Sequence, residues 1–240
     1  MGERKTYHRG RRKKKKGGII STLILIIAIA VFCVSGYQLY KIFGGYHQGK
    51  SEYDKVREVA VHGDDKDEDG FVVDFDELKK INADTVGWIR FYPEPSQISY
   101  PLVQTTDNDL YLNRTFSANE NTVGAIFVNC DNASDFSDRN TIIYGHRMRD
   151  HSMFHDLEKY KDESFWKENP YFYIYTPDGR KLTCHIYSAG IVKDTSSTYL
   201  TQFASDEEYQ AFLDDTKRAG AYHTGVEVTA DQRVVTLSTC

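Results

Sequence analysis

The sequence predicts a mainly β domain with helical insertions, preceded by an N-terminal transmembrane helix and a stalk. From residue 71 onward, short runs of β-branched and aromatic residues recur without the regular strand and helix alternation of a parallel doubly wound sheet. A barrel or a sandwich is therefore the expected architecture. Before that region, a long uncharged apolar run follows a strongly basic N-terminus, which is typical of a membrane segment.

Composition agrees with one folded domain that carries appendages. The chain has 240 residues, of which 40% are hydrophobic and 13% aromatic, enough to build a packed core. Its net charge of −5 hides an asymmetry, because residues 1–16 hold nine Lys and Arg against one Glu. The basic residues belong to the terminus, so we expect no nucleic-acid partner.

The N-terminal segment predicts a single membrane pass. Residues 1–18 are interpreted as a basic cytoplasmic tail and residues 19–40 as an uncleaved signal-anchor helix. The uncharged stretch from Gly17 to Tyr40 has 24 residues, which is enough to cross a bilayer as a helix. The positive flank predicts that the N-terminus stays in the cytoplasm and that the rest of the chain lies outside.

Two other kinds of signal compete with the anchor. A cleaved signal peptide could be cut near Ala28-Ile29-Ala30, but more apolar residues follow this site instead of a mature start. A lipoprotein signal would use Cys33, but Phe32 before it is bulky where a small residue is needed. We therefore interpret Cys33 as an apolar residue of the membrane helix.

Residues 41–70 are expected to form a solvated extracytoplasmic stalk, mobile or partly helical, because they end in an acidic run poor in apolar residues. The folded domain is then expected to span residues 71–240. Its first element is predicted to be a short helix, since Asp74 and Glu77 have the spacing of an N-cap and its third-position acid.

Short strands dominate the remainder of the predicted domain. Strands are expected at residues 86–91, 98–104, 124–129, 141–144, 171–176, 181–192, 226–228 and 233–240, with a helical turn at 153–160. Pro177-Asp178-Gly179 has the residue types of a tight hairpin turn. Ser205 and Glu208 form a capping box, which predicts a helix over residues 205–216.

Two of these strands end in reactive side chains. The run at residues 141–146 delivers His146, and the run at residues 233–240 delivers Cys240. If the two strands end side by side in one sheet, a thiol and an imidazole meet at a common rim, as a cysteine nucleophile requires. A papain-like hydrolase would place its cysteine before its histidine, so the order found here counts against that class.

The other cysteines and histidines favour structural roles. Cys130 and Cys184 lie in or at the end of apolar strands, where core packing is the expected function. His151 and His155 are four residues apart, a spacing that places two imidazoles on one helical face and could suggest zinc. Because no third ligand accompanies them at a diagnostic spacing, we expect a solvated helix face and neither a metal nor a cofactor.

The predicted domain resembles a sortase and, within that family, class B. The matching stretches are Tyr144-Gly145-His146 with Met148, Met153 and Phe154, the ending Thr236-Leu237-Ser238-Thr239-Cys240, Asp84 with Val86-Gly87-Trp88-Ile89, and Tyr100-Pro101-Leu102-Val103-Gln104 with Asp107 and Asn108. The late helix beginning at Ser205 is similar to the helix that marks class B. The resemblance covers about residues 71 to 240.

The resemblance implies a sortase-like β-barrel and a cysteine transpeptidase that works outside a Gram-positive cell, tethered by its anchor. Cys240 would attack the carbonyl of a surface-protein sorting-signal peptide and form a thioacyl enzyme. His146 would protonate the departing amine and later deprotonate the amine of a lipid-linked cell-wall precursor. Pilin polymerisation, in which the attacking amine differs, is an alternative role.

Substrate contacts are carried over from the family by position. Asn108 and Leu112 match one wall of the class B groove, whereas Thr195, Tyr199 and Leu200 match the loop before the late helix. Ser238 lies two residues before the nucleophile. Each of these residues is an expected substrate-binding residue.

Family members also carry an arginine on a strand after the cysteine, and the sequence ends at Cys240. Arg233 lies seven residues before Cys240, roughly 20 Å away at strand rise, so it cannot replace that arginine. We therefore expect the final barrel strand to be missing, a sheet edge to be unpaired, and the chain as written to be a fragment or inactive. A truncated sortase that only binds peptides is the corresponding alternative function.

Overall fold

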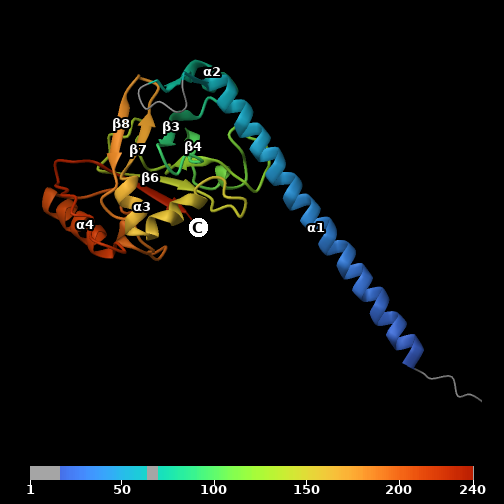
Figure 1. The fold of residues 1–240 in the computed structure, drawn as a ribbon. Helices are drawn as coiled ribbons and strands as arrows, with labels where there is room; N and C mark the ends of the chain where they lie inside the picture. The colour runs from blue at the N-terminus through green and yellow to red at the C-terminus, as the bar shows by residue number, and fades with distance from the viewer. Residues whose placement is uncertain (1–16, 64–69, 240) are drawn as a thin grey trace, which may run out of the picture. The chain divides into compact units, whose positions relative to one another are not determined.

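The computed structural model describes residues 17–63 and 70–239, and its fold is drawn in Figure 1. The chain divides into two compact units, residues 1–44 and residues 45–240, and helix α1 (Gly17–Ala60) contributes to both. Residues 1–16 of the basic tail, the acidic run at residues 64–69 and Cys240 lie outside the described residues. Predictions that concern them remain predictions.

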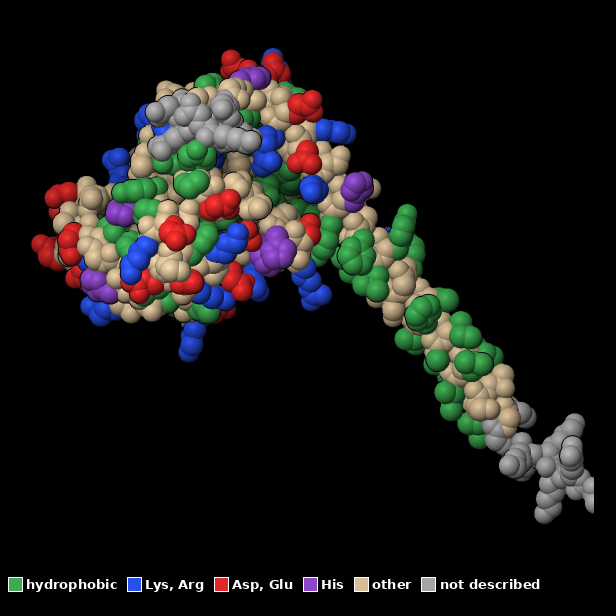
Figure 2. Space-filling model, in the orientation of Figure 1, with side chains coloured by type: hydrophobic (Ala, Val, Ile, Leu, Met, Phe, Trp, Pro, Cys, Tyr) green, Lys and Arg blue, Asp and Glu red, His purple; other side chains and the backbone are tan. Residues whose placement is uncertain are grey.

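The described part of the first unit is helical and apolar. Along the described residues there is one helix long and apolar enough to cross a membrane, near the N-terminus. Its large apolar side chains are exposed, for example Leu25, Phe32 and Val34, and Figure 2 shows hydrophobic side chains along this helix. Such exposure suits a segment whose surroundings are lipid.

The prediction of a solvated stalk at residues 41–70 is wrong for the second part of α1. Tyr53, Val56 and Ala60 are buried and belong to the main core. They are spaced by three and four residues, so they form one apolar stripe of the helix, and the ring of Tyr53 packs edge-on against Tyr100. The folded unit therefore begins at about Gly45 rather than at residue 71.

A seven-stranded sheet forms the body of the second unit and curls into a nearly closed barrel. Its spatial order is β8-β7-β3-β4-β5-β6-β9. The strands are β3 (Thr85–Phe91), β4 (Ser99–Val103), β5 (Ile126–Val128), β6 (Asn140–Gly145), β7 (Tyr171–Tyr175), β8 (Lys181–His185) and β9 (Val234–Thr239). A separate two-stranded sheet pairs β1 (Val61–His62) with β2 (Val72–Val73). The barrel interpretation is confirmed, and the sandwich is set aside.

Helices and 3-10 turns connect these strands. They are α2 (Phe75–Ile81), α3 (Glu163–Glu168), α4 (Asp206–Ala219), η1 (Leu110–Leu112), η2 (His155–Lys161) and η3 (Ser197–Tyr199). Asp74 caps α2 by accepting a 2.9 Å hydrogen bond from the backbone N–H of Glu77, as its spacing predicted. Ser205 caps α4 in the same way, through the N–H of Glu208. The hairpin turn between β7 and β8 contains Gly179 at φ 85°, a conformation suited to glycine.

Two predicted strands differ from the structure. Residues 226–228 are not a strand, and Val228 packs with Tyr209 and Phe212 of α4 in a second, smaller core. The second hairpin strand ends at His185, well before residue 192. Val228 thus packs against a helix, whereas residues 186–192 lie outside regular structure.

The pairing of β6 with β9 matters most for function. The two strands run parallel, and the last pair in register is Gly145 with Thr239. Parallel strands that are paired in register end at the same edge of a sheet. Among the described strands, β9 has β6 as its only neighbour.

Candidate active site

A cavity of about 170 Å³ opens where β6 and β9 end. The residues that line it come from β5, β6, β9 and the segment around η1, and they are Asn108, Leu112, Phe127, Tyr144, Gly145, His146 and Ser238. Four of them, Asn108, Leu112, His146 and Ser238, are predicted site residues. The fold therefore brings four of the predicted site residues together at one cavity.

His146 follows β6 and has a defined ring orientation. Its Nε2 lies 2.6 Å from the carbonyl oxygen of Leu112. A carbonyl oxygen only accepts, so Nε2 carries the hydrogen and, in the neutral ring, Nδ1 is left as the acceptor. The backbone carbonyl of His146 accepts a 2.9 Å hydrogen bond from the N–H of Phe154, which fixes the main chain on the other side.

Gly124 lies directly against the imidazole. A Cβ at this position would lie 2.8 Å from Cδ2 of His146, 2.8 Å from the carbonyl oxygen of Tyr111 and 2.9 Å from that of Leu112. Gly124 also has φ 66°, in the left-handed region that glycine tolerates best. The close approach of this backbone to the ring therefore requires glycine, which sequence reasoning did not anticipate.

The second part of α1 supports the segment that contacts His146. The hydroxyl of Tyr53 donates a 2.7 Å hydrogen bond to the carbonyl of Gly124 and accepts one of 3.2 Å from the N–H of Phe116. Burial raises the pKa of Tyr53 well above its usual value, so the hydroxyl keeps its proton. Glu52 accepts hydrogen bonds from Ser117 and Asn119 on the same segment. Helix α1 thus stabilises the segment that lies against the ring of His146.

Cys240 lies outside the described residues. Thr239, the residue before it, pairs with Gly145, the residue before His146. The remaining cysteines of the domain, Cys130 and Cys184, are not joined in disulfides. Burial raises the pKa of the Cys184 thiol to about 12, and burial together with Asp131 raises that of Cys130. Neither thiol has the depressed pKa of an activated nucleophile.

Asn108 and Leu112 form one wall of the cavity. The side-chain oxygen of Asn108 accepts a 2.9 Å hydrogen bond from the N–H of Cys130, and its amide nitrogen lies 3.4 Å from Asn129. Asn129 in turn donates to the hydroxyl of Tyr144. Tyr144 is a lining residue that the sequence analysis used only as part of a motif. Strand alternation places residues 144 and 146 on one face, which would have identified it.

The loop before α4 contacts Ser238, which lines the cavity. The hydroxyl groups of Tyr199 and Ser238 lie 3.1 Å apart and are hydrogen-bonded. Thr195 and Leu200 are exposed, and neither lines the cavity. The loop is attached through Asn140, whose side-chain nitrogen donates to the carbonyls of Leu200 and Thr198, at 2.8 and 3.2 Å. Asn140 is fully buried and also accepts a hydrogen bond from Thr236 of β9.

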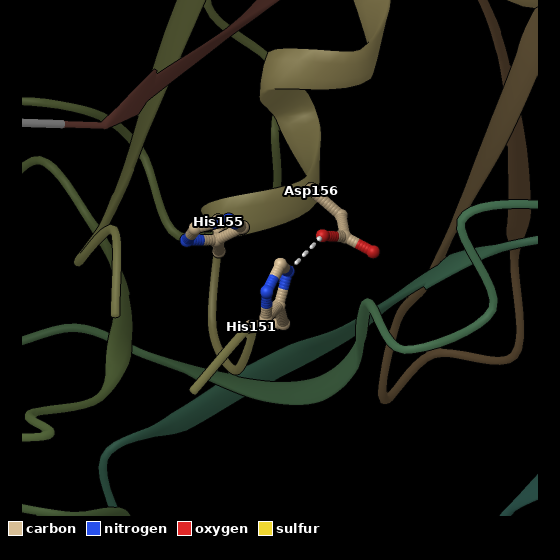
Figure 3. A group of neighbouring side chains, drawn as sticks. All are labelled: His151, His155 and Asp156. Atoms are coloured by element: carbon tan, nitrogen blue, oxygen red, sulfur yellow. Dashed lines mark ion pairs between the residues drawn. The ribbon is translucent and has the colours of Figure 1, made fainter. Parts of the chain in front are cut away.

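His151 and His155 do not share a helical face, contrary to the premise of the sequence analysis. His151 lies in the loop before η2, with φ 66°, and His155 is the first residue of η2. Their rings nevertheless contact each other, with centroids 4.1 Å apart. Figure 3 shows both beside Asp156, the residue that follows His155.

Comparisons with known proteins identify one family. The model of the sortase domain matches residues 94–240. Sortase B of Staphylococcus aureus is 31% identical over 219 residues, covering 91% of this chain and 88% of that protein. Sortase B of Listeria monocytogenes is 32% identical over 225 residues, covering 90% and 87%.

Solved structures give the same result. Sortase B of Bacillus anthracis in complex with AAEK1 matches with a TM-score of 0.72 and 34% identity, covering 83% of this chain and 92% of that one. A Staphylococcus aureus sortase B and substrate complex matches with a TM-score of 0.65 and 36% identity, covering 69% and 76%. The chain therefore belongs to the sortase family and, within it, to class B.

Proposed function

We propose that this chain is a membrane-anchored cysteine transpeptidase that attaches proteins to the cell wall, with Cys240 as nucleophile and His146 as its proton-transfer partner. The parallel register of β6 and β9 is the observation that carries this proposal. Because Gly145 pairs with Thr239, the next residues along the two strands are His146 and Cys240. An imidazole and a thiol are then delivered to the same edge of the barrel.

In this proposal the thiolate of Cys240 attacks the scissile carbonyl of a sorting-signal peptide. The tetrahedral intermediate collapses to a thioester as His146 transfers a proton to the departing amine. His146 then removes a proton from the incoming amine, which attacks the thioester and releases the thiolate. Since Nε2 is engaged by Leu112, Nδ1 is the ring nitrogen available for these transfers.

The cavity walls supply the peptide-binding groove of the proposal. Asn108 and Leu112 on one side and Ser238 on the other line the cavity, and Tyr199 reaches it through Ser238. Thr195 and Leu200 would contact the peptide only farther out, since both are exposed outside the cavity. One relative has been solved with a substrate and one with triglycine, so a peptide and a glycine amine are suitable probes.

None of the described residues that line the cavity is an arginine or a lysine. Arg233 precedes Val234 at the opposite end of β9. A peptide-binding role without turnover is the second candidate, and a turnover assay of the full-length chain with a sorting-signal peptide and triglycine separates it from the transpeptidase.

The anchor and its orientation belong to the same proposal. Residues 19–40 would span the membrane with the basic tail in the cytoplasm, so that the barrel faces the cell-wall precursor. Protease treatment of intact protoplasts tests this orientation. Digestion of the barrel from outside is expected, and a barrel that is digested only after lysis would contradict it.

Thiol labelling tests whether Cys240 is an activated nucleophile or an ordinary thiol. The thiol reagent MTSET, with which a relative has been solved, is applied to the full-length chain in detergent across a range of pH, and labelling of Cys240 is followed by mass spectrometry. Labelling is expected well below the pH of about 8.5 at which an ordinary thiol ionises. His146→Ala should move the profile to that ordinary value. An unchanged profile in His146→Ala would refute the proposed pair.

A further inference from the structure

Three side chains with metal-binding atoms gather in the loop that follows His146 and at the start of η2. His151, His155 and Asp156 each offer one such atom, and these atoms lie within 4.8 Å of one another. Figure 3 shows His151 and Asp156 pointing toward each other, with the ring of His155 beside His151. No third ligand stands at a diagnostic spacing in the sequence, but the fold brings the buried Asp156 to the two histidines.

We propose that His151, His155 and Asp156 bind one divalent cation of the zinc class. Two imidazoles and one carboxylate form a donor set that zinc accepts in three of its four tetrahedral positions, and water can take the fourth. Calcium and magnesium prefer sites made of oxygen atoms. Imidazole ligands instead favour Zn²⁺ and its neighbours in the first transition series.

The spacing of the ligand atoms is close to that of an occupied site. His151 Nδ1 lies 3.5 Å from Asp156 Oδ1. Two ligands of one tetrahedral zinc ion, each about 2.0 to 2.1 Å from the metal, are separated by about 3.4 Å. The wider separations in the cluster require side-chain rotation. His151 has the most freedom to rotate, because its side chain is 69% exposed.

One ring nitrogen of His155 is a second observation that favours a metal ligand. Its Nδ1 is buried and has no hydrogen-bond partner among the described residues. A buried polar atom without a partner raises the free energy of the folded state. Coordination of a cation by this nitrogen would remove that cost.

Asp156 keeps one oxygen available for a metal. Lys159 Nζ lies 2.9 Å from Oδ2, whereas Oδ1 faces His151. Carboxylate ligands are commonly hydrogen-bonded through their second oxygen, which orients the first toward the metal. Lys159 occupies the position of such an orienting partner, and its charge compensates the buried carboxylate.

The loop that carries this cluster returns to the active site. Phe154, the residue before His155, donates its N–H to the carbonyl of His146 at 2.9 Å. Met153 donates its N–H to the hydroxyl of Tyr100 on β4. A cation held by the three ligands would therefore restrain the main chain beside His146. The proposed ion is structural and takes no part in the transfer reaction.

Metal titration of the full-length chain tests the proposal. The chain is prepared in detergent without a histidine tag, stripped with a chelator, and titrated with Zn²⁺ and, separately, with Co²⁺. One equivalent of Zn²⁺ should bind and raise the unfolding temperature, and Co²⁺ should give the intense visible absorption of a tetrahedral site. Neither measurement depends on transpeptidation, so it is distinct from the test of the proposed function.

His151→Ala is the decisive variant, because His151 is exposed and its loss should not unfold the domain. Zn²⁺ affinity should fall at least about tenfold, and the tetrahedral cobalt spectrum should disappear. His155→Ala and Asp156→Asn should act in the same direction, whereas His223→Ala, an exposed histidine outside the cluster, should leave binding unchanged. Wild-type affinity in His151→Ala, or no stoichiometric binding by the unmodified chain, would overturn the proposal.

Discussion

Two segments at the active-site cavity are attached to the barrel in different ways: the first wall, from Leu112 to Gly124, lines the cavity through Leu112, and the second wall, from Thr195 to Leu200, reaches it only through the contact of Tyr199 with Ser238. The segment from Leu112 to Gly124 is hydrogen-bonded to Tyr53 and Glu52 of α1. The loop from Thr195 to Leu200 is held mainly by Asn140 and by the contact between Tyr199 and Ser238. The first wall contacts the imidazole directly, and the second does not.

This difference suggests a division of labour. A wall whose backbone is hydrogen-bonded to a helix with one buried face keeps the histidine in one orientation, which proton transfer requires. A wall attached at a few points can adapt to a peptide. Perturbing the first wall should therefore alter the reactivity of Cys240, whereas perturbing the second should alter peptide affinity. Four substitutions test this comparison, in decreasing order of expected effect.

Gly124→Ala is expected to have the largest effect. The new Cβ would clash with His146 and with two backbone carbonyls, at a backbone conformation that alanine disfavours. Displacing a catalytic group by about 1 Å can reduce a rate about 100-fold, and we expect a loss of this order in MTSET labelling of Cys240 at neutral pH.

Gly179→Ala is the matched control for this prediction. Gly179 also has a positive φ, of 85°, but a Cβ there meets nothing within 4 Å. It shares the backbone strain without the clash. Equal labelling rates for the two variants would show that Gly124 acts through stability rather than through His146.

Asn140→Ala should release the second wall. The substitution removes a fully buried side chain and leaves the carbonyls of Leu200 and Thr198 and the hydroxyl of Thr236 without their partner. The free energy of unfolding should fall by about 2 kcal/mol, measured by urea denaturation. Gln202→Ala, exposed in the same loop, should have almost no effect. Peptide affinity should also fall, because the second wall loses its attachment. An affinity equal to that of the wild-type chain would contradict the role assigned to this wall.

Tyr53→Phe removes one hydroxyl from the support of the first wall. Two buried backbone groups lose their partner, so we expect a loss of about 1.5 kcal/mol in stability and about tenfold slower labelling of Cys240. In Tyr160→Phe, which removes a buried hydroxyl bonded to the carbonyl of Asn169, stability should fall with labelling unchanged. The inference fails if both variants label alike.

Tyr199→Phe should have the smallest effect. It removes one partly exposed hydrogen bond to Ser238. Peptide affinity is expected to fall about threefold, measured by fluorescence anisotropy with a sorting-signal peptide, while the unfolding midpoint and Cys240 labelling stay constant. A change in the rate of Cys240 labelling would instead show that Tyr199, like Tyr53, affects the reactivity of Cys240.

The sequence by itself determined the fold class, the membrane-helix candidate and the late capped helix, because these depend on local patterns. Strand alternation, capping residues and an uncharged apolar run act over a few neighbouring residues, and α2 and α4 begin at the capping residues Asp74 and Ser205. The motif around His146 was also local, and its resemblance to a sortase identified the family that the comparisons confirmed.

Only the tertiary structure decided what surrounds His146. Gly124, which lies against the ring, and Tyr53, which supports Gly124, are distant from His146 in sequence, and the hydrogen bonds of Tyr53 span 63 and 71 residues. Asp156 became a candidate metal ligand only when a loop with a left-handed residue brought it to His151. The physical reason is that long-range contacts depend on how strands and helices pack, and no local periodicity encodes which distant backbone group a buried hydroxyl will meet.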